Sequence, residues 1–180
     1  MQKTFGALSF PSSYESSMKS KKLTKLYRAI KSKDYDAIKK GLQTYSRSSL
    51  CEESILFLGH FIDEETVGFL LQNGVNANEQ DEMGDTVLNY ASAENNVKEM
   101  ELLIRHGAFL DFPNVHGEDA FSFACVKGAL DAAIFLYNHG SKMQWVKKNW
   151  DTNTLYGNNF LSNEIIDFLK SIHIFDPKLY

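Results

Sequence analysis

Apolar residues recur along this chain with two spacings, a short one of about three to four residues and a long one of 33. The short spacing predicts amphipathic α-helices, since side chains three and four apart share one helix face. The long spacing aligns four columns of residues: Leu70, Leu103, Leu136 and Leu169; Phe69, Leu102, Phe135 and Phe168; Val67, Met100, Ala133 and Ile166; Gly74, Gly107, Gly140 and His173. A fixed period of about 20–50 residues is typical of an array of stacked units.

The two spacings together divide residues 21–180 into five helix-turn-helix units, at about 21–46, 47–80, 81–113, 114–146 and 147–180. We expect helices near 53–60 and 63–73 in the second unit and near 163–172 in the fifth. The two outer units are degenerate, as terminal caps must be, because only one of their faces is buried. Residues 1–20 are rich in serine and contain Pro11, which predicts a flexible N-terminal arm.

The unit at 81–113 is the most regular, and its pattern resembles the ankyrin repeat. The matching residues are Gly84, Thr86, Leu88, Ala91, Leu102, Leu103, Gly107 and Ala108. The resemblance implies an all-α ankyrin-repeat solenoid of about five units, with short hairpin turns between its helices. Val87 and Asn89 replace the proline and histidine of the family pattern. We expect these replacements to weaken the bonding of the turn and to leave the architecture unchanged.

Several polar and glycine positions predict where helices begin and end. Thr86, Asp119 and either Ser162 or Asn163 can cap a helix N-terminus with a side-chain oxygen. Gly84 suits a turn with positive φ, and Gly107 suits the left-handed residue that ends a helix. His106 and His139 hold the same position in two units, just before that glycine, where the negative end of the helix dipole favours them.

Charge is distributed unevenly along the chain. Residues 1–50 hold 11 basic and 3 acidic residues, whereas residues 51–180 hold 8 and 20, and the net charge is −4. The basic residues from Lys19 to Lys33 could touch phosphates or an anionic membrane surface. No nucleic-acid motif accompanies them, so we expect a solvated cap helix in preference to a nucleic-acid or membrane site.

The resemblance implies that partners contact the hairpin tips and the exposed side of the first helix in each unit. Their positions within the 33-residue repeat identify the candidate partner-binding residues, which are Leu50, Glu52, His60, Phe61, Glu82, Met83, Asp85, Glu94, Val115, His116, Glu118, Lys127, Asp151 and Phe160. Apolar anchors surrounded by acids suit a basic, amphipathic segment of another protein. The alternative is that the apolar side chains pack against neighbouring tips.

Enzymatic chemistry has little support in the sequence. The two cysteines fit a reducing compartment rather than a disulfide scaffold, and Cys125 follows a small position at which we expect packing between helices. The five histidines are distributed over separate units, without the spacing of zinc ligands. We therefore expect no catalytic residue, no cofactor and no metal.

The sequence thus predicts a cytoplasmic protein, monomeric on its own, that binds another protein as an adaptor, inhibitor or effector. The alternatives are a regulatory or scaffold subunit of a stable complex and a small enzyme with an unrecognised site. Many Asn, Lys and Phe residues suggest an AT-rich genome. If the source is an intracellular bacterium, the family resemblance implies an effector delivered to the host-cell cytoplasm.

Overall fold

The computed structural model describes residues 21–44, 55–60, 62–149 and 161–173. It separates the chain into two compact parts, residues 1–75 and 76–180, which we call the N-terminal part and the C-terminal part. Over the described residues the secondary structure is α-helical, apart from an isolated antiparallel bridge between Gln80 and Thr86. The predicted all-α repeat solenoid is confirmed.

The N-terminal part contains four helices: α2 (Lys21–Lys31), α3 (Tyr35–Thr44), α4 (Ile55–His60) and α5 (Glu64–Gln72). The pairs α2–α3 and α4–α5 pack as hairpins, and α2 also packs on α4. Ile30, Ile38, Ile55 and Leu70 are fully buried among them. Each of these hairpins is a helix-turn-helix pair of the kind that the sequence predicts.

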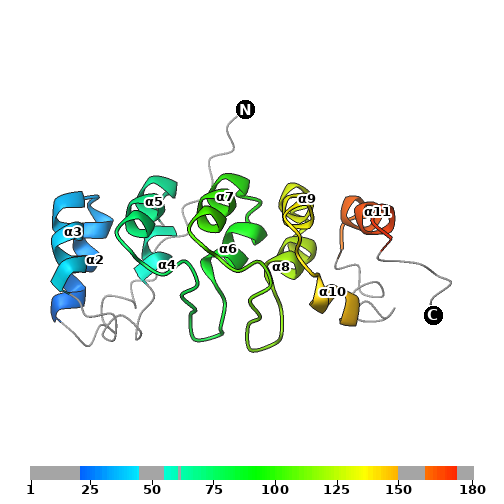
Figure 1. Ribbon diagram of the computed structural model, residues 1–180, viewed down its shortest axis with the longest axis horizontal. Helices are drawn as coiled ribbons and strands as arrows, with labels where there is room; N and C mark the ends of the chain where they lie inside the picture. Colours follow the sequence, from blue (N-terminus) through cyan, green and yellow to red (C-terminus); the bar gives the residue numbers. More distant parts are fainter. Residues whose placement is uncertain (1–20, 45–54, 61, 150–160, 174–180) are drawn as a thin grey trace. The chain divides into compact units, whose positions relative to one another are not determined.

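The C-terminal part contains six helices in its described residues: α6 (Val87–Ala93), α7 (Val97–Arg105), α8 (Ala120–Lys127), α9 (Leu130–Asn138), α10 (Gln144–Asn149) and α11 (Asn163–Ser171). In Figure 1, α7, α9 and α11 form one row, and α6 and α8 form a second row beneath it. Two long loops, residues 76–86 and 109–119, extend from the second row. This arrangement leaves the first row as one outer face and the loop tips as another.

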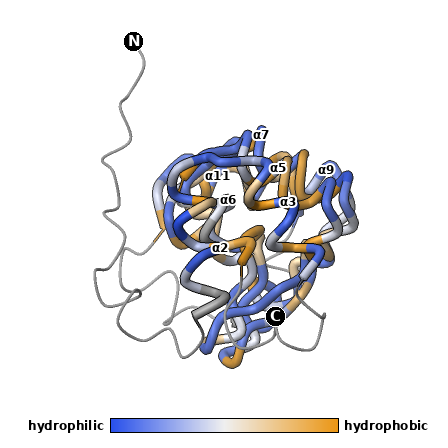
Figure 2. The backbone as a smooth tube through the Cα atoms, turned by 90° about the vertical axis from the view of Figure 1, so that its left-hand side faces the viewer, coloured by the Kyte–Doolittle hydropathy of each residue, from blue (hydrophilic) through white to orange (hydrophobic). Residues whose placement is uncertain are grey.

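The 33-residue columns identify the core. Leu103, Leu136 and Leu169 are each fully buried, as are Met100 and Ala133. The preceding column, Leu102, Phe135 and Phe168, is only half-buried. Figure 2 shows the result as hydrophobic and hydrophilic stretches alternating along the helices. Burial of one stripe per helix accounts for the stacking of units that are not stable alone.

The predicted helix ends are confirmed. Thr86 caps α6, Asp119 caps α8 in a capping box with Ser122, and Ser162 caps α11. Gly107 has φ of +87° directly after the C-cap His106, and His139 is the C-cap of α9. Side-chain oxygens at the N-termini satisfy backbone N–H groups that have no partner within the helix.

Neighbouring units of the C-terminal part are joined by a hydrogen bond that repeats with the period of the sequence. Oδ1 of Asn78 accepts the backbone N–H of Phe109 at 2.7 Å. Oδ1 of Asp111, 33 residues later, accepts the backbone N–H of Lys142 at 2.8 Å. These bonds fix the register of one loop on the next, so the loop tips have defined relative positions.

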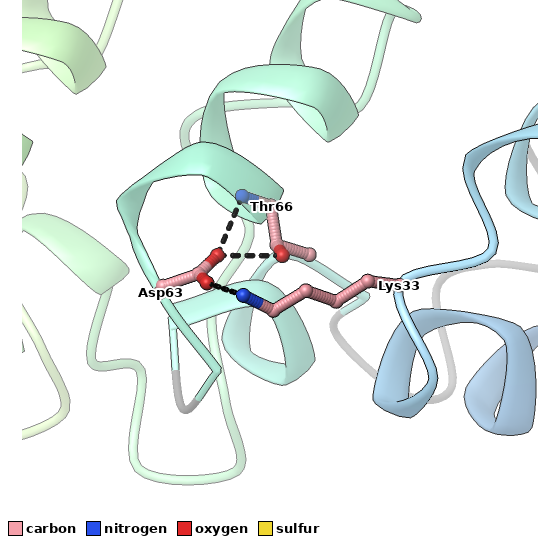
Figure 3. Close-up of polar contacts among 3 residues, drawn as sticks. All are labelled: Lys33, Asp63 and Thr66. Atoms are coloured by element: carbon pink, nitrogen blue, oxygen red, sulfur yellow. Dashed lines mark hydrogen bonds and ion pairs between the residues drawn. The ribbon is translucent and has the colours of Figure 1, made fainter.

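A polar cluster joins two hairpins of the N-terminal part (Figure 3). Asp63 is the N-cap of α5, and its Oδ1 accepts the backbone N–H of Thr66 at 2.9 Å and the Thr66 hydroxyl at 2.7 Å. Oδ2 of the same carboxylate accepts a charged hydrogen bond from the Lys33 ammonium. Partial burial acts to raise the pKa of Asp63, but the hydrogen bonds from Lys33 and Thr66 outweigh it and hold the pKa below its usual value.

We expect Asp63→Asn to remove a pH-dependent contribution to stability while keeping the helix cap, because asparagine caps as well as aspartate. A carboxylate with a lowered folded-state pKa stabilises the fold above its unfolded pKa, about 3.9. That stabilisation is lost as the pH falls through the folded pKa. The free energies of unfolding of wild type and Asp63→Asn should therefore differ at neutral pH and converge in acid. Denaturant titrations across this pH range would measure the difference, and a constant gap would contradict the assignment.

Asp63→Ala removes the cap as well, and we expect it to cost about 1 kcal/mol more than Asp63→Asn at every pH. Lys33→Met is the matched variant that removes the ion pair and retains the cap. It should reproduce the effect of Asp63→Asn at neutral pH.

Candidate protein-binding surface

Each of the two long loops of the C-terminal part contains a tight turn that begins at an aspartate or an asparagine. Oδ1 of Asp81 accepts the backbone N–H groups of Met83 and Asp85, both at 2.9 Å. The Gly84 N–H donates to the Asp81 carbonyl at 2.9 Å, and Gly84 has φ of +77°. Side-chain bonding of this kind fixes a tight turn, and glycine supplies the left-handed conformation that the turn needs.

The second loop repeats these contacts 33 residues later. Oδ1 of Asn114 accepts the backbone N–H groups of His116 and Glu118, both at 2.9 Å. Gly117 has φ of +78° and donates to the Asn114 carbonyl at 2.9 Å. The backbone N–H of Val115 also donates to the Met83 carbonyl at 3.0 Å. The two tips therefore lie side by side and present their side chains as one surface.

The tip surface consists of Glu82, Met83, Val115, His116 and Glu118. Met83 is 48% exposed and Val115 is 65% exposed. Glu82 and His116 are exposed, and Glu118 is half-buried. Two apolar side chains thus lie beside two carboxylates. Apolar side chains at these exposures leave area that a partner can bury.

Asp85 belongs to the loop scaffold and not to the exposed surface, which corrects its place among the predicted binding residues. It is only 8% exposed. Its Oδ1 accepts Nδ2 of Asn114 at 2.8 Å and Nδ2 of Asn89 at 3.4 Å. The carboxylate is directed inward because it bridges the two loops, and a buried polar group needs such partners.

Asn89, which replaces the histidine of the family pattern, takes part in the bonding of the turn. It is 1% exposed, and its Oδ1 accepts the Thr86 hydroxyl at 2.9 Å while Nδ2 reaches Asp85. The backbone N–H of Asn89 donates to Oγ1 of Thr86 at 3.3 Å. The turn therefore retains reciprocal side-chain bonding in this unit.

The remaining predicted residues lie apart from the tips or outside the described structure. Glu94, which is half-buried, is the C-cap of α6, and the exposed Lys127 is the last residue of α8. Both therefore lie about 10 Å from the helix ends that the loops join, given a rise of about 1.5 Å per residue. His60 is buried at the end of α4 in the N-terminal part. The predicted residues that lie outside the described residues are Leu50, Glu52, Phe61, Asp151 and Phe160.

Three exposed apolar residues were missed by sequence reasoning: Phe109, Ile134 and Tyr137, with 62%, 36% and 39% of their surface exposed. Phe109 stacks on Phe112 with ring centroids 6.0 Å apart. The signal that could have found Ile134 and Tyr137 is the repeat itself. Each stands where another unit has a charged residue.

Cys125 is packed between helices as predicted, with 1% of its surface exposed. Burial raises the pKa of its thiol above the usual range, and this disfavours the nucleophilic thiolate. Within the described ranges, no three His, Cys, Asp or Glu side chains are grouped as metal ligands. No helix in this part of the chain is long and apolar enough to cross a bilayer.

Comparison with known proteins relates the chain to a family and to a viral protein. The family model for ankyrin repeats in three copies matches residues 59–145. A putative ankyrin repeat protein of Acanthamoeba polyphaga mimivirus is 34% identical over 77 residues, which are 42% of this chain and 19% of that relative. The chain thus spans a small fraction of the length of the relative. The residues that the family model matches include both loops of the tip surface.

Proposed function

Since residues 59–145 of the chain are ankyrin repeats, a kind of module that commonly binds other proteins, we propose that the tip surface binds a basic, amphipathic segment of a partner. The observation that carries this proposal is the pairing of Met83 and Val115 by a backbone hydrogen bond. Both side chains remain about half exposed or more. A partner that covers them would bury apolar area at the centre of the contact.

Charge indicates the chemistry of the partner. Glu82 and Glu118 flank the two apolar residues, and Glu94 lies farther along the first helices. Among the predicted binding residues that the structure describes, Lys127 is the one lysine or arginine. Carboxylates at the rim of an interface attract basic segments and raise the rate of association. A segment with one apolar and one basic face would match this arrangement.

The proposal can be tested with two synthetic helical peptides, one of Leu and Lys and one of Leu and Glu in the same amphipathic pattern. We expect the basic peptide to bind, with an affinity that falls as salt is added. Met83→Ala combined with Val115→Ala should weaken binding by about tenfold or more. Fluorescence anisotropy would measure both effects.

The matched control is Phe109→Ala, which removes an exposed apolar side chain outside the tip surface. It should leave the affinity unchanged. Equal binding of the acidic peptide, or equal loss in the Phe109 variant, would contradict the proposal. Glu82→Lys with Glu118→Lys should reverse the preference between the two peptides.

A role as a regulatory or scaffold subunit is the second candidate, and the exposed Ile134 and Tyr137 on α9 favour it. These residues lie on a helix face separate from the tips. The role of a delivered bacterial effector and a host-cell location stay predictions. The viral relative gives them no support.

A further inference from the structure

The outer faces of α7, α9 and α11 differ in one respect. These helices occupy equivalent places in successive units, so residues 33 apart have the same position. At one position the residues are Glu101, Ile134 and Asp167, and at another they are Ile104, Tyr137 and Lys170. Ile134 and Tyr137 are 36% and 39% exposed, and they lie one turn apart on the same face of α9. The middle helix therefore carries apolar side chains where the helix on at least one side carries a charge.

Neighbouring contacts hold this apolar strip in place. Both α7 and α11 pack against α9, one on each side. The Tyr137 ring meets the Phe168 ring edge-on, with centroids 5.9 Å apart. Ile104 and Phe168 are half-buried at the two margins. The strip is therefore pre-ordered, and covering it would cost little side-chain entropy.

Ion pairs border the strip on both sides. On α7, Glu101 pairs with Arg105 at 2.5 Å, and on α11, Asp167 pairs with Lys170 at 3.9 Å. All four of these side chains are exposed. In each pair the acid precedes the base by about one helical turn. Since the helices are repeat equivalents and run in the same direction, the acids lie toward one end of the face and the bases toward the other.

We propose that a second copy of this chain covers the face, with its helices antiparallel to those of the first. The two-fold axis then runs along the row of helices, so that each helix meets its own equivalent. Glu101 faces Arg105 of the second copy, and Asp167 faces Lys170 of the second copy. Ile134 meets Tyr137 of the second copy. Every contact occurs twice, as an isologous interface requires.

Charge complementarity selects this occupant and this orientation. A parallel arrangement would place acid over acid and base over base on the flanking helices, and like charges in contact are unfavourable. The antiparallel arrangement pairs all of them. Three helices of nine residues give an area at the low end for a specific interface, so the dimer should dissociate on dilution. This differs from the monomer that the sequence predicted.

Sedimentation velocity over a series of protein concentrations tests the proposal with the full chain. We expect a reversible monomer–dimer equilibrium. Ile134→Lys should weaken the dimer by about 30-fold, as expected for loss of a central contact. Phe109→Lys is the matched control, because it also exchanges an exposed apolar side chain for lysine, and it should leave the equilibrium unchanged. Circular dichroism and the unfolding midpoint report that each variant is folded.

A charge exchange distinguishes a second copy from any other partner. Glu101→Lys alone should weaken the dimer by several-fold, because it replaces two attractive contacts by repulsive ones. Adding Arg105→Glu should restore it, because the exchanged pair is again self-complementary. The double variant should pair with wild type more weakly than with itself, by the same several-fold factor, because their mixed dimer contains the two repulsive contacts.

Three results would overturn the proposal: a monomer at every concentration, failure of the double variant to restore the dimer, or dissociation caused by Phe109→Lys. If wild type is a monomer that binds a different protein, and Ile134→Lys loses that binding, the face belongs to an interface with that protein. Self-association would then be wrong.

Discussion

Replacing Phe121 with alanine is expected to lower the free energy of unfolding by about 3–5 kcal/mol. Phe121 lies in α8 and has none of its surface exposed. Helix α8 packs on both α6 and α9, so its side chains help to join two successive units. Truncation removes buried apolar area and leaves a cavity that the surrounding helices can fill only in part.

The effect should extend beyond one unit. Stability in a repeat array is approximately the sum of the unit stabilities and the contacts between neighbours. Loss of a contact at α8 lowers both the stability of its own unit and the contact energy with the neighbouring unit. Urea titrations would then show a lower midpoint, and a lower slope as well if the units begin to unfold separately.

Phe109→Ala is the matched control, because it deletes the same atoms from a side chain that is 62% exposed. It should cost at most about 1 kcal/mol, mainly for the lost stacking on Phe112. If both variants lost similar stability, burial at Phe121 could not be the reason. A loss below about 1 kcal/mol for Phe121→Ala would contradict the packing described for α8.

The sequence predicted those parts of the fold that depend on local or strictly periodic information. The column of Leu103, Leu136 and Leu169 is buried because each unit repeats the same packing. Thr86 and Asp119 cap their helices through atoms only three residues away. Such contacts can be inferred without knowledge of the neighbouring unit.

The predicted surface was less accurate, because side-chain direction there depends on residues distant in sequence. Asp85 is turned inward by Asn114, 29 residues later. The repeat period predicts where the loops lie, but it does not predict the hydrogen bond between Asp85 and Asn114. Ile134 and Tyr137 lie on an outer helix, away from the tip positions at which the family resemblance places partners. A comparison of exposed positions between units would have shown the change from charged to apolar.

Gly84→Ala is expected to destabilise the C-terminal part and to weaken partner binding together. Gly84 has φ of +77°, and an L-residue held there costs about 1–2 kcal/mol. A Cβ atom would also lie 3.1 Å from the Val115 nitrogen and 3.2 Å from the Asn114 Cα. Both are backbone atoms that cannot rotate away, so crowding should add roughly 1–3 kcal/mol.

Gly107→Ala separates the cost of backbone strain from the cost of crowding against the neighbouring loop. Gly107 has φ of +87°, but a Cβ atom there would have no neighbour within 4 Å. Its substitution should therefore show the backbone cost alone, and the difference between the two variants in denaturant titrations measures the contact between tips. Crowding at Gly84 would push Val115 away from the Met83 carbonyl, so only Gly84→Ala should also weaken binding of the basic peptide. If the two variants were equally stable and bound equally well, the tips would not be in contact, and the surface proposed to bind a partner would not exist as one unit.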